Sequence, residues 1–325
     1  MDLEQSAETG RRSIVLKLAV SSVAPERQYD VPKRTLIFTH IPRTAGTTLD
    51  RIFRSIASIK KVSSRRAMGT IYGQYLGKEK GDALDFLTNP SKDLSALKYI
   101  FGHVPYGIHE KLGLRDVAYG VVLRNPRNRI MSQIRLGLKE TYNISTDDIA
   151  ALIKDKNLVD NCQVRMIAGC TDGTEKCDDK MLDKALENLK ENYSYVGFQE
   201  SLPIFIHTLI ESEGWPSVMF LDRHKSRQAT LNVSSTEISK LQDYIRLDAD
   251  LYSEAQKLVG NYELGQNTNR LNDYIQGKGE KNLADVVVGV MPDTLMGHSV
   301  VQLSPDLFPR FHKRMMDKGL AIEEI

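Results

Sequence analysis

The sequence predicts an α/β protein with a central parallel sheet that helices flank on both faces. Three apolar segments have the length and composition of buried strands: Thr35–Thr39, Tyr99–Phe101 and Ala118–Leu123. The first and the third of them lead directly into segments with helical periodicity. Strands that alternate with helices form parallel sheets, and such sheets bind ligands at the carboxyl ends of their strands.

The helices follow from periodicity and from turn residues. A helix is expected over residues 46–59 because the apolar residues from Leu49 to Ile56 repeat at three- and four-residue spacing. Pro126 suits the first turn of a second helix, just after the strand that ends at Leu123. Further helices are expected over residues 147–156, 158–168, 179–192, 202–211 and 235–258, and further strands over residues 195–198 and 217–220.

The chain is expected to divide into three parts. Residues 1–32 are weakly periodic and form a partly ordered lead-in, and residues 33–260 carry the α/β domain. Residues 261–325 form an extension of unknown role, which we expect to be helical. Within this extension, Leu283–Met291 is apolar enough for either a strand or a core helix.

Composition excludes several classes of protein. Hydrophobic residues make up 41% of the 325 residues, and 44 Lys and Arg nearly balance 42 Asp and Glu. This balance is not the signature of a polyanion-binding protein, so nucleic acid is not an expected partner. No apolar run approaches the roughly 18 residues that span a membrane, and the N-terminal segment is too charged for a signal peptide. We expect a soluble, cytoplasmic protein with no membrane partner; homo-oligomerisation stays open.

The loop between the first strand and the first helix has the composition of an anion site. Backbone N–H groups at the start of a helix lack intrahelical partners, and the helix dipole favours negative charge there. Donors in this loop come from Arg43, Thr44, Ala45, Gly46, Thr47 and Thr48. The loop is not a Walker A motif, because Gly-Lys-Ser/Thr occurs nowhere in the chain. A phosphate or sulfate ester fits the pattern, and a strand–loop–helix corner without a ligand is the alternative.

A second candidate anion site begins at Arg124, which ends the third strand. Ser132 follows eight residues later, about two turns into the next helix, so both side chains can face one anion. Arg127 and Arg129, which lie between them, are expected to be surface residues or structural ion-pair partners.

Three motifs, in order along the chain, resemble those of sulfotransferases, in particular the heparan sulfate/uronosyl 2-O-sulfotransferase branch. The segment from His40 to Thr48 resembles the 5′-phosphosulfate loop, with Arg43 where that branch has Lys. The pair Arg124 and Ser132 resembles the 3′-phosphate motif, with Asn125 in place of the usual Asp. The third motif is Asn-x-Gln-x-Arg, at residues 161–165.

The resemblance implies a P-loop-like sulfotransferase fold. Unlike the animal enzymes of this branch, the chain is expected to be a soluble, bacterial-type member of the group. It implies 3′-phosphoadenosine 5′-phosphosulfate as donor, a hydroxyl of a carbohydrate or small metabolite as acceptor, and no metal. Arg43 and the loop donors would hold the transferred group, and Arg124 and Ser132 the 3′-phosphate. Gln163 and Arg165 would line the acceptor cleft, although the helix that carries them also reads as a simple core stripe.

The resemblance also assigns the catalytic base to His103, in the Gly-His element after the second strand. Sulfuryl transfer to an alcohol needs a base that works near neutral pH, and unperturbed imidazole titrates at about 6.5. Competing candidates are His40, His109, Asp50, Glu79 and Glu110.

A late basic segment, with Arg223, Lys225 and Arg227, is expected to close over the nucleotide or to be a solvated charge run. The chain has three cysteines, for which reduced thiols are the expectation. The resemblance adds the alternative of a bridge between Cys170 and Cys177. Two other functions stay open: a Mg-ATP-dependent small-molecule kinase and a non-catalytic protein that binds adenosine bisphosphate.

Overall fold

The computed structural model describes most of the α/β domain and parts of both flanking segments. The described residues are 14–22, 25–28, 30–67, 97–137, 158–170, 175–221, 235–260, 286–288, 306–317 and 320–324. The helix expected over 147–156, Glu79 and the basic segment with Arg223 lie outside these ranges.

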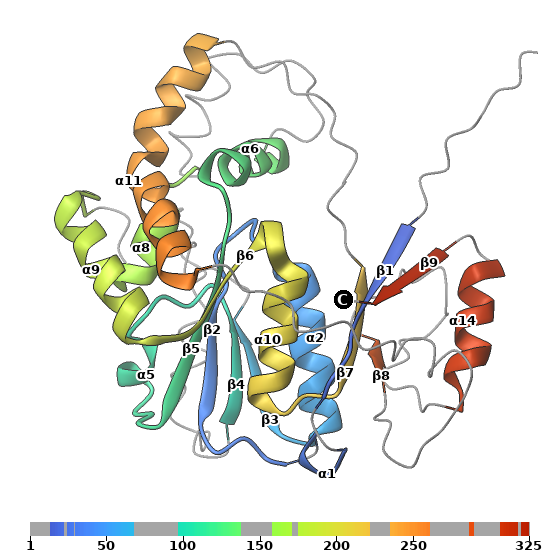
Figure 1. The fold of residues 1–325 in the computed structure, drawn as a ribbon. Helices are drawn as coiled ribbons and strands as arrows, with labels where there is room; N and C mark the ends of the chain where they lie inside the picture. The colour runs from blue at the N-terminus through green and yellow to red at the C-terminus, as the bar shows by residue number, and fades with distance from the viewer. Residues whose placement is uncertain are drawn as a thin grey trace, which may run out of the picture.

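The centre of the protein is a five-stranded sheet in which every pair of neighbours is parallel (Figure 1). The strands lie in the order β3 (Ser63–Ala67), β4 (Leu97–Gly102), β2 (Thr35–Thr39), β5 (Val117–Leu123) and β6 (Tyr193–Phe198). The prediction of a parallel α/β sheet is therefore confirmed. Strand β3 was not predicted, because its sequence, Ser-Ser-Arg-Arg-Ala, carries no apolar signal.

Helices cover both faces of this sheet. One face carries α2 (Gly46–Ile59) and α10 (Leu202–Glu213), and the other carries α5 (Ile108–Lys111), α8 (Cys162–Ala168) and α9 (Asp179–Glu191) (Figure 1). The 25-residue helix α11 (Ser235–Val259) packs on α8 and α9, and it also contacts α6 (Pro126–Gly137) beyond the edge of the sheet. The short η1 (Gln199–Ser201) joins β6 to α10.

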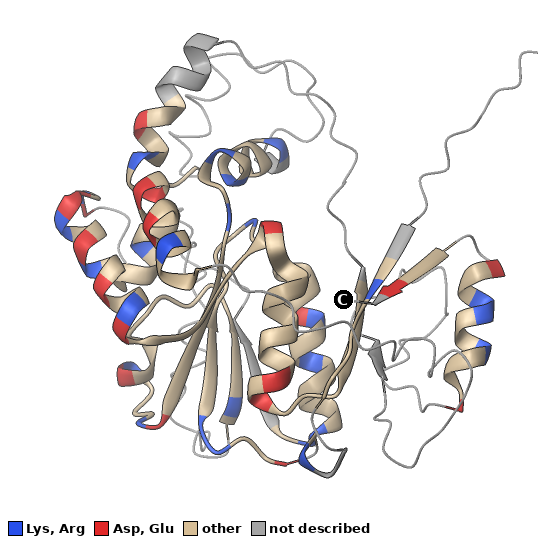
Figure 2. Cartoon of the chain, viewed as in Figure 1, with Lys and Arg blue, Asp and Glu red and all other residues tan. Residues whose placement is uncertain are grey.

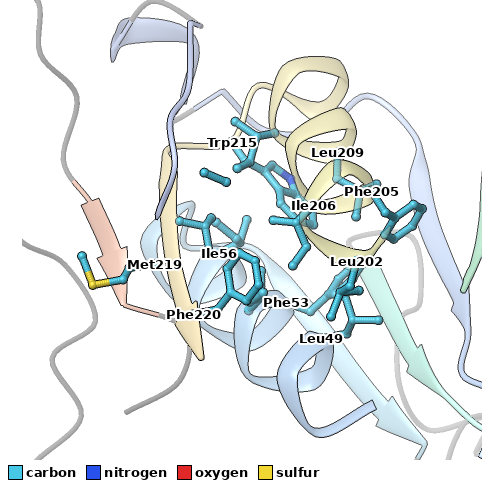
Figure 3. Close-up of a cluster of buried hydrophobic side chains, with 14 of the residues drawn as sticks. Leu49, Phe53, Ile56, Leu202, Phe205, Ile206, Leu209, Trp215, Met219 and Phe220 are labelled. Carbon is cyan, nitrogen blue, oxygen red and sulfur yellow. The ribbon is translucent and has the colours of Figure 1, made fainter. Parts of the chain in front are cut away.

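The core between α2, α10 and the sheet fixes the position of α2 (Figure 3). Phe53 of α2 contacts Trp215 edge-on, with ring centroids 5.1 Å apart, and lies 5.3 Å from Phe38 of β2. Leu49 and Ile56 complete the apolar face of the helix and are fully buried. The apolar residues that the sequence predicted for one side of α2 are therefore the residues that contact the core. This packing determines where the N-terminus of α2 lies.

A second sheet joins the two ends of the chain to the domain. Its order is β8 (Val286–Val288), β7 (Ser217–Leu221), β1 (Ile14–Ala19) and β9 (Leu320–Glu324), and β1 runs antiparallel to β7 but parallel to β9. The helix α14 (Phe308–Asp317) packs beside β9, and α1 (Pro25–Gln28) follows β1.

The expectation of a helical extension was therefore wrong for its described part, which contains two strands and one helix. The physical reason is that β8 and β9 are short and pair with strands far away in sequence. Because these distant partners specify the strands, the local pattern alone does not decide between strand and helix. The strand reading of Leu283–Met291 is confirmed at β8.

Most other elements match the predicted ones within two residues, but α8 begins at Cys162 instead of residue 158. Asn161 has a left-handed backbone, with φ of 41°, and its side-chain oxygen accepts the backbone N–H groups of Leu247 and Asp248, at 2.9 and 3.2 Å. Among the described helices, none is long and apolar enough to cross a membrane.

Asp248 ties α11 to both α8 and α6. Its Oδ1 accepts the backbone N–H of Val164 at 2.9 Å, and its Oδ2 lies 3.7 Å from Nε of Arg129 on α6. Both side chains are buried, so Arg129 is the structural ion-pair partner that the sequence predicted. Burial raises the pKa of Asp248 to about 6, although Arg129 acts in the opposite direction.

We predict that Asp248 makes the stability of the protein depend on pH. Because its folded pKa of about 6 exceeds its unfolded value, the stabilising effect of protonation is present at low pH and is lost as the pH rises through 6. The free energy of unfolding of the wild type minus that of Asp248→Asn should fall by up to about 3 kcal/mol over this range. Urea unfolding of both proteins from about pH 3.8, the unfolded value, to neutral pH tests this, and a constant difference would contradict it.

Candidate functional site

The strand order gives the loop between β2 and α2 a central position. The chain leaves β2 toward β3 on one side of the sheet and leaves β5 toward β6 on the other. A crevice forms where neighbouring strands lead in opposite directions, and ligands bind there in open α/β sheets. The loop after β2 and Arg124 after β5 both lie at this point.

The loop itself has an unusual backbone. Arg43 and Ala45 have positive φ angles, 74° and 66°. Each costs roughly 1–2 kcal/mol for a residue with a side chain. A left-handed residue followed by a helical one turns successive N–H groups toward one concave surface, which is an anion-binding arrangement. No side chain caps the N-terminus of α2, and its first turn has no acidic residue. The backbone donors thus face a site without a built-in anion.

Gly46 is the first residue of α2, and its role is steric. A Cβ at this position would overlap the imidazole of His40, which packs beneath the loop. The backbone N–H of His40 bonds to the carbonyl of Gly102 at 2.7 Å and so extends the β2–β4 pairing by one residue. His40 and Gly46 together set how closely the loop lies on the end of the sheet.

The threonines of the loop differ in their availability. Thr44 is fully buried, and its hydroxyl and N–H both donate to the carbonyl of Ile41, at 2.7 and 3.3 Å. Its donors therefore close the turn, contrary to the expectation that they would bind the anion. Thr47 is exposed and Thr48 is half-buried on the first turn of α2, so their hydroxyls remain the accessible ones.

Arg43 links the two motifs that the sequence singled out. Its Nε donates to Oγ of Ser132 on α6 at 2.9 Å. Nη1 of Arg124 donates to the backbone carbonyl of Arg43, also at 2.9 Å. The loop after β2, the end of β5 and the second turn of α6 thus meet in one cluster, which we call the arginine cluster: Arg43, Arg124 and Ser132.

The arginine cluster carries excess positive charge. Desolvation lowers the pKa of Arg43 and of Arg124, and the carboxylate of Glu200 acts against this lowering at Arg124. Three further guanidinium groups add to the lowering at Arg124: those of Arg43, Arg135 and Arg129. Within the described ranges, no carboxylate forms an ion pair with Arg43. Figure 2 shows the basic residues of α6 and of the segments between α6 and the sheet. A bound anion would offset the mutual repulsion of these guanidinium groups.

Two histidines stack at the same edge. The rings of His40 and His103 lie 4.9 Å apart at 22°, and the ring of His40 also stacks on Phe101 at 5.4 Å. His40 is buried, whereas His103, just after β4, is half-buried and reaches the rim. Of the two, His103 is the imidazole that a substrate at this edge can approach.

The rival bases lie in other environments. Nδ1 of His109 bonds to the hydroxyl of Tyr119 at 2.9 Å, within an aromatic cluster on the α8 and α9 face. Asp50 is buried on α2 and pairs with Arg54 at 3.1 Å, and Glu110 is exposed on α5.

No protein-family model and no curated protein matched this chain.

The structure places Gln163 and Arg165 inside the protein instead of in an open cleft. The Gln163 side chain is fully buried and bonds to the backbone of Arg124. Arg165 pairs with Asp160 at 2.8 Å and donates to the carbonyl of Glu175 at 2.7 Å. Both side chains thus support the fold, and this arrangement does not favour contact with an acceptor.

None of the three cysteines forms a disulfide, so Cys170 and Cys177 are not bridged. Among the described residues, no three His, Cys, Asp or Glu side chains gather into a group that could hold a metal ion. Arg127 is exposed on the first turn of α6. Arg223, Lys225 and Arg227 lie outside the described residues.

Glu200 is a site residue that the sequence analysis missed. It lies in η1, after β6, where its Oε1 accepts the backbone N–H of Asn125 at 3.0 Å and its Oε2 accepts the hydroxyl of Tyr252 at 3.0 Å. Asn125 in turn caps α6, since its Oδ1 accepts the N–H of Asn128 at 3.2 Å. No local motif marks Glu200; only its place at the end of a parallel strand could have indicated it.

We predict that Gly46→Ala disturbs the loop through His40. The added methyl group must displace a buried imidazole, and overpacking of this kind costs about 1–3 kcal/mol. In a His40→Ala background the same substitution should cost much less, because the space is then available. Chemical unfolding of the two single variants and the double variant measures this coupling, and additive losses would argue against it.

Proposed function

We propose that the protein is an O-sulfotransferase that moves the sulfuryl group of 3′-phosphoadenosine 5′-phosphosulfate to a hydroxyl of a carbohydrate or small metabolite. The observation that carries this proposal is the junction of the two anion motifs: Arg43 bonds to Ser132, and Arg124 bonds to the backbone of Arg43. A donor that carries a 5′-phosphosulfate and a 3′-phosphate on one ribose needs two adjacent cationic sites.

The arrangement of the sheet supports this proposal. The loop with Arg43 and Ala45 follows the central strand and presents backbone donors at the start of α2. The second anion site follows the neighbouring strand β5 and continues into α6. The order of strands, β3-β4-β2-β5-β6, makes β2 and β5 neighbours and so brings the two anion motifs to adjacent strand ends.

In the proposed reaction, His103 accepts the proton of the acceptor hydroxyl as its oxygen attacks sulfur. The new S–O bond forms while the bond from sulfur to the 5′-phosphate oxygen breaks, which yields a sulfate ester and adenosine 3′,5′-bisphosphate. His103 then releases the proton to solvent. Arg43 and the N–H groups of the loop stabilise the negative charge that grows on the leaving phosphate.

His103 fits the role of base better than His40 does. It is half-buried at the end of β4, next to the loop, and stacks on His40, which fixes the orientation of its ring. His40 is enclosed by Phe101, His103 and Gly46, so its part is to support the loop and the base.

We predict that adenosine 3′,5′-bisphosphate binds to the protein in excess EDTA. Both arginines and Ser132 contribute charge-assisted hydrogen bonds, so Ser132→Ala should weaken binding about tenfold. Calorimetry measures both affinities. Binding of ATP with Mg²⁺, and no binding of the bisphosphate, would instead support a kinase.

We also predict that Arg43→Ala and His103→Ala lose sulfuryl transfer. Loss of one donor to the developing charge lowers kcat by about 10²–10³, and loss of a general base by about 10²–10⁴. The assay follows release of the bisphosphate with an alcohol acceptor. Arg127→Ala, on the exposed surface of α6, and His207→Gln, on α10, are matched controls that should keep full activity.

His103→Ala should still bind the bisphosphate with nearly wild-type affinity, because the base does not hold the donor. Full turnover in this variant would remove His103 as the base. Tight bisphosphate binding without turnover in the wild type, over a broad set of alcohols, would favour a non-catalytic binding protein.

A further inference from the structure

The side chain of Gln163 holds the backbone of Arg124 with two hydrogen bonds. Its Oε1 accepts the N–H of Arg124 at 2.9 Å, and its Nε2 donates to the carbonyl of Arg124 at 3.0 Å. Gln163 is fully buried at the start of α8. The carboxamide therefore satisfies both polar groups of one peptide residue, as a neighbouring strand would.

Arg124 needs such support because of where it lies. The strand β5 ends at Leu123 and α6 begins at Pro126, so Arg124 belongs to neither element. Its guanidinium must nevertheless point toward the loop after β2, where Nη1 donates to the carbonyl of Arg43. Two bonds on the backbone fix the direction in which the Cα–Cβ bond leaves the chain. They reduce the conformational freedom that the side chain must lose on binding an anion.

Gln163 is itself held firmly from behind. The next residue, Val164, donates its N–H to Asp248 of α11 at 2.9 Å. Asn161, two residues before Gln163, accepts the N–H groups of Leu247 and Asp248. The start of α8 is thus fastened to α11, and Gln163 transmits that fixed position to Arg124.

We propose that Gln163 is a positioning residue for the anion site, which acts through Arg124 to favour a nucleotide with a 3′-phosphate over one without it. This inference rests on the proposed function, because the proposed role of Arg124 is to hold the 3′-phosphate. It also reassigns Gln163: with no exposed surface, the side chain acts on the donor site instead of on an acceptor.

The test compares two ligands by calorimetry, adenosine 3′,5′-bisphosphate and adenosine 5′-monophosphate. Gln163→Met keeps the length of the side chain but removes both hydrogen bonds, and Gln163→Asn keeps the amide but draws it back by one methylene. Each should weaken binding of the bisphosphate about tenfold, as loss of a supporting partner does at metal sites, and leave binding of the monophosphate nearly unchanged. Gln256→Met, on the exposed face of α11, is the matched control and should change neither affinity.

Arg124→Ala supplies the second arm of the experiment. If Gln163 acts through Arg124, then adding Gln163→Asn to Arg124→Ala should cause no further loss of bisphosphate affinity. Thermal unfolding of each variant reports the purely structural effect of the lost bonds. A purely structural effect should weaken both ligands alike and leave the ratio of the two affinities unchanged.

The outcomes are distinct. Equal weakening of both ligands in the Gln163 variants, or additive losses with Arg124→Ala, would overturn the positioning role and leave the proposed function intact. Failure of the wild type to bind the bisphosphate would overturn the proposed function and this inference with it.

Discussion

The packing of α2 against the central sheet is the constraint on which the candidate site depends. Phe53, Leu49 and Ile56 bury one side of the helix against Phe38 and Trp215, so the helix cannot shift along its axis without opening this core. Its N-terminus is thereby held at the carboxyl ends of β2 and β4. The left-handed residues Arg43 and Ala45 persist because the strand before them and the helix after them are both fixed.

A second set of contacts places the other half of the site. The helix α11 holds the start of α8 through Asp248 and Asn161, and α8 holds Arg124 through Gln163. Arg129 of α6 pairs with the same Asp248. The arginine cluster therefore draws its geometry from two sources, one on each face of the sheet, and the bond between Arg43 and Ser132 is where they meet.

The sequence could predict those features that have a local cause. The strands β2 and β5, the helix α2 and the turn at Pro126 all follow from apolar periodicity or from a single conformationally restricted residue. The positions of Arg43, Arg124 and His103 at strand ends followed from the same reasoning. Three features could not be predicted: the inward hydroxyl of Thr44, the two hydrogen bonds from Gln163 to the backbone of Arg124, and the bond from Asn125 to Glu200. Each depends on the side to which a residue faces or on a partner distant in sequence. Strand β3, strands β1 and β9, and the pairing of the second sheet could not be predicted for the same reason, since polar or short strands are specified by their neighbours.

The second sheet has a consequence for how the chain folds. Lys17 of β1 bonds to Glu323 of β9 across 306 residues of sequence, and β1 also pairs with β7 from the middle of the chain. Closing loops of this length is entropically costly and slow, whereas α2, β2, β4 and β5 associate over much shorter separations. During synthesis, the parallel sheet and its anion loop can therefore assemble while β1 still waits for β9. We therefore expect the pairing of β1 with β9 to be completed late in folding.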